Sequence, residues 1–145
     1  MATSVDSANL ILKLYELRRE PVMREARNFV FGFNPSTVEE YMAGVTGANG
    51  AYIRMVTSYW EMAASFVAGG AVDADMFEAS AGEHLIVFGK IESFLPQLRE
   101  AMGNPNLFKN LEQVCISAPG GLERARATIA RIRSMMAARS SAAAS

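Results

Sequence analysis

The sequence predicts a single all-α domain, and three observations support that prediction. Half of the 145 residues are hydrophobic, which is enough for a packed core and argues against global disorder. Apolar side chains recur at helical spacing along most of the chain, whereas sustained period-two alternation between tight turns is missing. Glycines and prolines interrupt the pattern at intervals typical of helices. We therefore expect a compact bundle of about five to seven helices over residues 1–139, followed by a low-complexity, frayed tail over residues 140–145.

The N-terminal helix is predicted to carry a kink. Pro21 lacks a backbone N–H and clashes with the preceding turn, so the helix should bend or break near Arg19 to Glu20. The apolar pattern resumes after the proline and ends near Gly32. This part of the chain should therefore form two helical arms.

Two Asn-Pro dipeptides resemble helix start signals. Asn34-Pro35 and Asn104-Pro105 would each place asparagine at the N-cap and proline at the first helical position. Between them, Asp73 caps a short predicted helix, and a further pattern runs to Gly103 with a kink or a fresh turn at Pro96.

The helix near residues 48–68 is expected to lie at the centre of the bundle. Its apolar residues form two adjacent stripes, a face wider than a surface helix shows; they are Ile53, Val56, Trp60, Ala63 and Val67, and Tyr52, Met55, Tyr59, Met62 and Phe66. The polar remainder is a narrow strip of four residues: Arg54, Ser58, Glu61 and Ser65. A helix with this pattern should be covered on most sides.

The polar strip suggests one candidate site. If Arg54 and Glu61 are enclosed, both need partners, because an unpaired buried charge is costly. One interpretation is a polar pocket that binds a small molecule or a metal, formed by Arg54, Ser58, Glu61, Glu83 and His84. The alternatives are a structural ion-pair network and a strip that faces solvent. His84 shares a stripe with Phe88, which also fits a buried histidine with one hydrogen-bond partner.

Few other residues point to chemistry. The chain has one histidine and one cysteine, no Glu-x-x-His pair and no phosphate-binding glycine loop, so we assign no catalytic residue, metal ligand or cofactor. Cys115 lies between Val114 and Ile116 and is expected to act as a small core hydrophobe. A single cysteine forms no intrachain disulfide, and neither a secretory leader nor a membrane-spanning stretch is found, so we expect a cytoplasmic protein.

The last predicted helix is the main candidate for interaction. It is amphipathic, and from Leu122 onward one glutamate faces five arginines, a net charge of +4 against −5 for the preceding residues. The helix can pack on its own bundle, contact a second subunit, or bind nucleic acid or anionic lipid, and the last of these three alternatives is the least favoured. The candidate interface consists of Leu122, Ala125, Arg126, Ile129, Ile132, Arg133 and Met136.

Several short motifs resemble a family of small all-helical bacterial proteins known only as a domain of unknown function. The motifs are Tyr15-Glu16-Leu17-Arg18, Tyr59-Trp60-Glu61-Met62, Gly69-Gly70-Ala71-Val72-Asp73, Phe77, Gly82-Glu83-His84 and Phe94-Leu95-Pro96-Gln97-Leu98-Arg99, and the resemblance covers about residues 8–135. It implies a helical fold and a bacterial setting, and it carries no activity or site residue.

The sequence thus favours a non-enzymatic protein that acts through self-association or through another protein partner. The alternative is a bundle that binds a small molecule or a metal near Arg54, Glu61 and His84.

Overall fold

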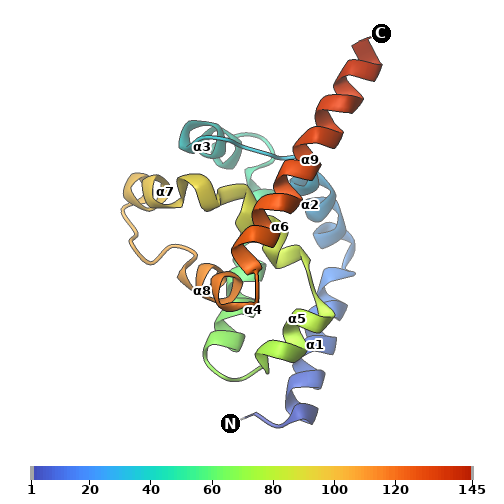
Figure 1. Ribbon diagram of the computed structural model, residues 1–145, viewed down its shortest axis with the longest axis vertical. Coiled ribbons are helices and arrows are strands. Elements are labelled where there is room, and N and C mark those ends of the chain that lie inside the picture. The colour runs from blue at the N-terminus through green and yellow to red at the C-terminus, as the bar shows by residue number, and fades with distance from the viewer. Residues whose placement is uncertain (1, 145) are drawn as a thin grey trace.

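Nine α-helices and one 3₁₀ turn make up the regular structure of residues 2–144, which are the residues that the computed structural model describes (Figure 1). No strand occurs among them, so the all-α prediction is confirmed. The elements are α1 (Ser4–Arg18), α2 (Pro21–Phe31), α3 (Val38–Thr46), α4 (Gly50–Ala68), α5 (Ala74–Ser80), α6 (Glu83–Ile91), η1 (Glu92–Phe94), α7 (Leu95–Met102), α8 (Lys109–Ser117) and α9 (Gly121–Ala144).

The predicted number of helices is too low because both predicted kinks are full breaks. At the first, Glu20 is the N-cap of α2, and its carboxylate accepts hydrogen bonds from the backbone N–H groups of Val22 at 3.1 Å and Met23 at 2.9 Å. Pro21 occupies the first helical position, where its missing N–H costs nothing. At the second, the turn η1 separates α6 from α7 ahead of Pro96.

Neither Asn-Pro dipeptide caps a helix. Thr37 is the N-cap of α3 and accepts from the backbone N–H of Glu40 at 3.2 Å. The helix predicted at Asn104-Pro105 begins only at Lys109, after a turn in which Phe108 adopts a left-handed conformation with φ 57°. Asn104 instead accepts a hydrogen bond from the N–H of Asn106, which stabilises a turn.

Helix α4 is the central element, as predicted. It packs against α2 on one side and α8 on another, and it also contacts α3, α5 and α6. Trp60, Ile53 and Val56 are almost completely buried along it, with 1% of each side chain exposed. The second apolar stripe is less enclosed, since Met62 keeps 39% of its surface exposed.

Helix α9 packs on α6 with its first half and projects beyond the body of the protein with its second half (Figure 1). The two helices approach closely at Gly89, where an added Cβ would lie 2.5 Å from Cγ1 of Ile129 and 2.9 Å from the carbonyl oxygen of Ala125. The helix continues to Ala144, through most of the segment 140–145 predicted as a frayed tail; Ser145 lies outside the described residues.

Candidate functional site

The five residues of the predicted polar pocket do not come together. Arg54 is exposed and donates to the backbone carbonyl of Val45 at 3.0 Å, so it supplies a hydrogen-bond donor to one of the last carbonyl groups of α3. Ser58 is also exposed and donates to the carbonyl of Met55 in its own helix. The first half of the polar strip therefore faces outward rather than into the core.

Glu61 acts as a cap for another helix. Its carboxylate accepts from the backbone N–H of Leu111 at 2.9 Å and from the side-chain amide of Asn110 at 2.7 Å. Helix α8 has no side-chain cap of its own, and the first N–H groups of a helix need external acceptors. Glu61 therefore joins the central helix to α8.

Glu83 forms a second, separate contact. It accepts from Nε and a terminal nitrogen of Arg27 at 2.8–3.1 Å, and from the indole N–H of Trp60 at 3.1 Å. Hydrogen bonding to Glu83 raises the pKa of Arg27 above its usual value. This side-on ion pair connects α2 to the start of α6 next to the tryptophan.

His84 is completely buried and belongs to a third group. Its Nε2 lies 2.8 Å from Oε1 of Glu78, and Arg124 donates to the other oxygen of Glu78 at 2.9 Å. Burial lowers the pKa of His84 against the opposing effect of Glu78. A carboxylate only accepts, so the neutral ring carries its proton on Nε2, and Nδ1 has no partner among the described residues.

The candidate interface on α9 is largely a contact within the chain. Ala125, Ile129 and Ile132 are buried, Leu122 and Met136 are half-buried, and the first half of the helix covers α6. Arg126 pairs with Glu92 at 2.6 Å, and Arg133 donates to the carbonyl of Pro35 at 3.0 Å. The apolar seam of the heptad pattern is thus occupied in the monomer.

Lys90 and Cys115 are buried groups with strongly shifted pKa values. Lys90 donates to the carbonyls of Phe31 and Phe33 and to the side chain of Asn34, at 2.6–3.3 Å, and burial lowers its pKa to about 8. Burial raises the pKa of the Cys115 thiol to about 12, so the thiol is inert at neutral pH, in agreement with its predicted core role. Sequence reasoning could not single out Lys90, because the carbonyl groups that surround it come from residues more than 50 positions earlier in the chain.

A hollow of about 300 Å³ lies beneath α1, in contact with the buried aromatic residues Trp60 and Phe77. Its walls come from α1, α4, α5 and the residue that follows α5; the lining residues are Ile11, Leu12, Leu14, Tyr15, Arg18, Trp60, Phe77, Ser80 and Ala81. Aromatic and aliphatic side chains predominate, and none of the lining residues is acidic. This composition is typical of a small-molecule site.

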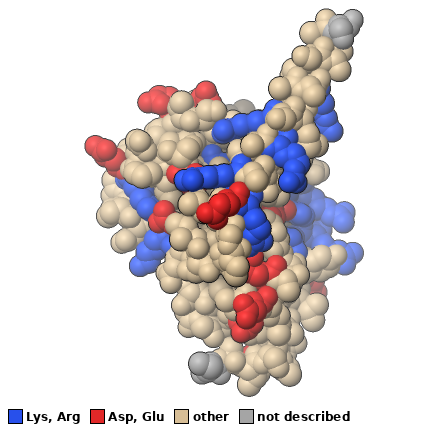
Figure 2. All heavy atoms as spheres, viewed as in Figure 1, with Lys and Arg blue, Asp and Glu red and all other residues tan. Residues whose placement is uncertain are grey.

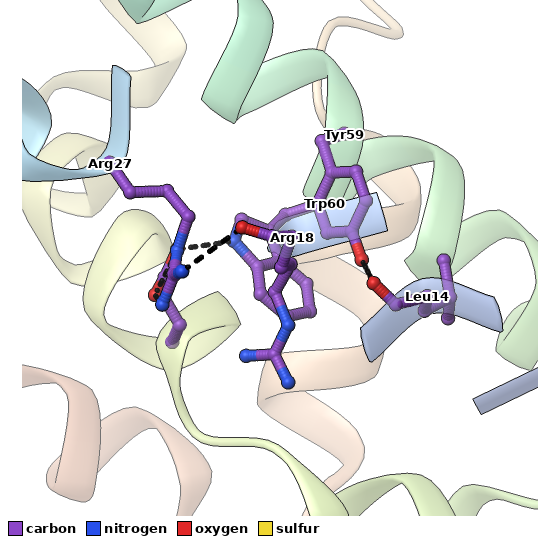
Figure 3. A network of polar contacts seen from close by, with 6 residues as sticks. Leu14, Arg18, Arg27, Tyr59 and Trp60 are labelled. Atoms are coloured by element: carbon purple, nitrogen blue, oxygen red, sulfur yellow. Dashed lines mark hydrogen bonds and ion pairs between the residues drawn. The ribbon is translucent and has the colours of Figure 1, made fainter. Parts of the chain in front are cut away.

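Arg18 is the one charged residue in the lining. Its guanidinium carbon lies 5.4 Å from the ring centre of Trp60 and 5.4 Å from that of Tyr15, and its Nε is buried without a hydrogen-bond partner. Figure 3 shows the guanidinium directed away from the pair formed by Arg27. The sequence contained a signal for this residue, because Arg18 follows Ile11 and Leu14 at helical spacing on an otherwise apolar stripe.

Tyr59 fixes α1 over the cavity. Its hydroxyl donates to the backbone carbonyl of Leu14 (Figure 3). Burial raises the pKa of Tyr59 to about 12, so the hydroxyl remains a donor at neutral pH. A tether from the central helix thus holds the wall of the cavity in place.

Within residues 2–144 no group of three or more potential metal ligands is found. In the same part of the chain, no helix combines the length and the apolar composition needed to cross a bilayer.

Fold and cavity together define an all-α protein with an arginine-lined apolar hollow beneath its first helix. The chain belongs to the family described as "Domain of unknown function (DUF4760)", whose model matches residues 3–117, and this confirms the resemblance noted from the sequence. Comparison with curated proteins and with solved structures found no match. The family match includes the cavity and ends before α9.

Proposed function

We propose that this chain is a binding protein that holds a small, mainly apolar molecule in the cavity beneath α1. The observation that carries the proposal is the cavity itself, about 300 Å³ in volume and lined by Tyr15, Trp60 and Phe77. Apolar concave sites with few polar groups are the usual form of small-molecule sites. The proposal keeps the binding role predicted as the alternative from the sequence and moves it away from Arg54, Glu61 and His84.

The lining favours binding over catalysis. Arg18, Tyr15 and Ser80 are the lining residues with polar side chains, and Ser80 donates to the carbonyl of Phe77 rather than into a reactive arrangement. The guanidinium group of an arginine does not lose its proton in proteins, so such a residue serves neither as a general acid nor as a general base. The site can hold and orient a ligand.

Trp60 provides the test, because it is the only tryptophan and lies in the cavity wall. Its fluorescence should change saturably when the full chain is titrated with 1-octanol or octanoate. Ala81→Met, which fills the cavity, should weaken both responses, whereas Ala51→Met on the exposed side of α4 should not. If neither probe gives a saturable change or raises the melting temperature, the proposal is wrong.

A second candidate function is self-association through the end of α9. Residues 134–144 extend this helix past the body, where their surface is mostly uncharged (Figure 2). Met135 is 46% exposed and Phe31 is 44% exposed, and the two residues line one small surface hollow. An isolated helix of this length is marginal in water, so cover by a second copy would stabilise it.

Light scattering after size-exclusion chromatography tests this second proposal. The full chain should form a dimer, and a chain that ends at Arg133 should be a monomer while keeping the α6–α9 contact. Met135→Glu should also abolish the dimer. Arg131→Glu, on an exposed part of the helix, is the control and should leave the dimer intact. A monomeric full chain at micromolar concentration overturns the idea.

A further inference from the structure

We infer that the ligand of the cavity is a monocarboxylate with an apolar body, and that the guanidinium of Arg18 binds its carboxylate. The inference rests on the proposed binding function and adds the chemical class of the ligand. It starts from the arginine, because an apolar cavity alone would not distinguish an alcohol, an acid and a hydrocarbon.

Arg18 is held in place without being neutralised. Its guanidinium stacks over Trp60 and Tyr15, with 5.4 Å from the guanidinium carbon to either ring centre. Among residues 2–144, no carboxylate forms an ion pair with it, and its Nε is buried without an acceptor. A buried donor without a hydrogen-bond partner is unfavourable, so a ligand that supplies an acceptor to this guanidinium would be stabilised.

The carboxylate that accepts from the indole N–H of Trp60 is already engaged. Glu83 accepts from Arg27 and from the indole N–H of Trp60, and Arg27 also donates to the backbone carbonyl of Arg18 at 3.4 Å. Arg27 therefore satisfies Glu83 through Nε and a terminal nitrogen, the planar edge that matches a carboxylate. Arg18 lines the hollow with the same kind of planar group, and no ion pair to a carboxylate is found for it among residues 2–144.

The local charge favours an anion and disfavours a cation. Arg19 also lies over Tyr15, with its guanidinium carbon 5.8 Å from the ring centre, so two arginines flank that ring. No acidic residue lines the cavity. An amine or a quaternary ammonium would find aromatic faces here, but those faces are already covered by guanidinium groups.

The volume sets the size of the ligand. About 300 Å³ corresponds to roughly ten non-hydrogen atoms, if each takes about the 30 Å³ that a water molecule takes in the liquid. Ile11, Leu14 and Phe77 supply apolar wall for the body of the ligand. Octanoate has this number of atoms and this distribution of polarity, and so it is a suitable probe.

The experiment compares octanoate with 1-octanol, which has the same chain without the charge, by titration of Trp60 fluorescence in the full-length protein. Octanoate should bind about tenfold or more tightly than octanol, as expected for a charge-assisted pair of hydrogen bonds. Arg18→Met should remove this preference and leave octanol binding in place, which also shows that the variant is folded. Arg24→Met removes the same charge from an exposed position on α2 that does not line the cavity, and it should retain the preference.

A second variant and a third probe keep the test decisive. Arg18→Lys retains the charge but not the planar edge, so the preference for octanoate should fall several-fold if the pair is bidentate. Equal binding of octanoate and octanol, or an unchanged preference in Arg18→Met, overturns the inference that Arg18 binds a carboxylate, but it leaves the proposed binding function intact. Tighter binding of octyl sulfate than of octanoate would also overturn it, and failure of every probe overturns both proposals.

Discussion

The buried ammonium group of Lys90 should make the protein more stable at pH 9 than at pH 7. Its side chain is only 3% exposed, and it faces the carbonyls of Phe31 and Phe33 and the amide oxygen of Asn34 rather than a carboxylate. Burial therefore lowers its pKa from 10.5 to about 8 in the folded protein. The unfolded chain binds the proton more tightly, so stability rises with pH between these two values.

The magnitude follows from the two pKa values of Lys90. Integrating proton binding from pH 7 to pH 9 gives a contribution of about 1 kcal/mol to the free energy of unfolding. Below pH 7 the contribution is constant, because Lys90 is then charged in both states. From about pH 8 upward the thiol of Cys115, whose pKa burial raises from 9.0 to about 12, acts increasingly in the opposite direction, so the measurement should stop at pH 9 and rely on the comparison with the variant.

Urea denaturation followed by Trp60 fluorescence measures the effect. Wild type and Lys90→Met are compared at pH 7 and pH 9, and only the difference between their pH dependences is interpreted. Lys90→Met is expected to be less stable at both values because it leaves carbonyl groups unpaired. If the variant gains as much stability as wild type between pH 7 and pH 9, Lys90 is not the responsible group and the reasoning fails.

Three further predictions concern packing, capping and acid stability. Gly89→Ala should destabilise the protein by about 1–2 kcal/mol in urea denaturation, because the added Cβ would lie 2.5 Å from Ile129; an unchanged midpoint would show that α9 is not seated as described. Glu61→Gln should cost about 1 kcal/mol by weakening the cap of α8, with Ser58→Ala as the neutral control on the same helix, and equal midpoints for the two variants would contradict the capping role. Stability should fall as pH drops below 6.5, because burial holds the pKa of His84 below that value and the unfolded chain takes up the proton first; the same decline in His84→Gln would assign it to other groups.

The positions of the helices could be predicted from the sequence where they depend on local signals. The span of α4, the break at Pro21 and the buried position of Cys115 all follow from periodicity, from proline geometry and from apolar neighbours. The signal at Asn104-Pro105 was wrong because a local turn at Asn104 competes with helix initiation. The signal at Asn34-Pro35 was wrong because the side-chain oxygen of Asn34 accepts from Lys90 instead of from a helix N–H.

The candidate site could not be predicted in the same way, since its partners are distant in sequence. Two adjacent apolar stripes on α4 predicted a helix covered on most sides, yet Met62 stays 39% exposed and the polar strip faces outward at Arg54. Periodicity reports which residues share a face, but it does not report which faces find a neighbour. The cavity depends on how α1 lies across α4 and α5, and that placement is fixed by a contact between Tyr59 and Leu14, 45 residues apart.

Helix α8 is capped by a side chain of another helix, and this has a consequence for the order in which the protein folds. This helix has nine residues, begins after Phe108 in a left-handed conformation, and receives its N-terminal acceptor from Glu61, 50 residues earlier in the chain. So short a segment has little helical tendency alone. We therefore expect α8 to remain unformed until α4 is present as a template, and a peptide spanning residues 104–118 to be unstructured by circular dichroism. The central helix then acts as a template for α8, which becomes ordered only by docking onto it.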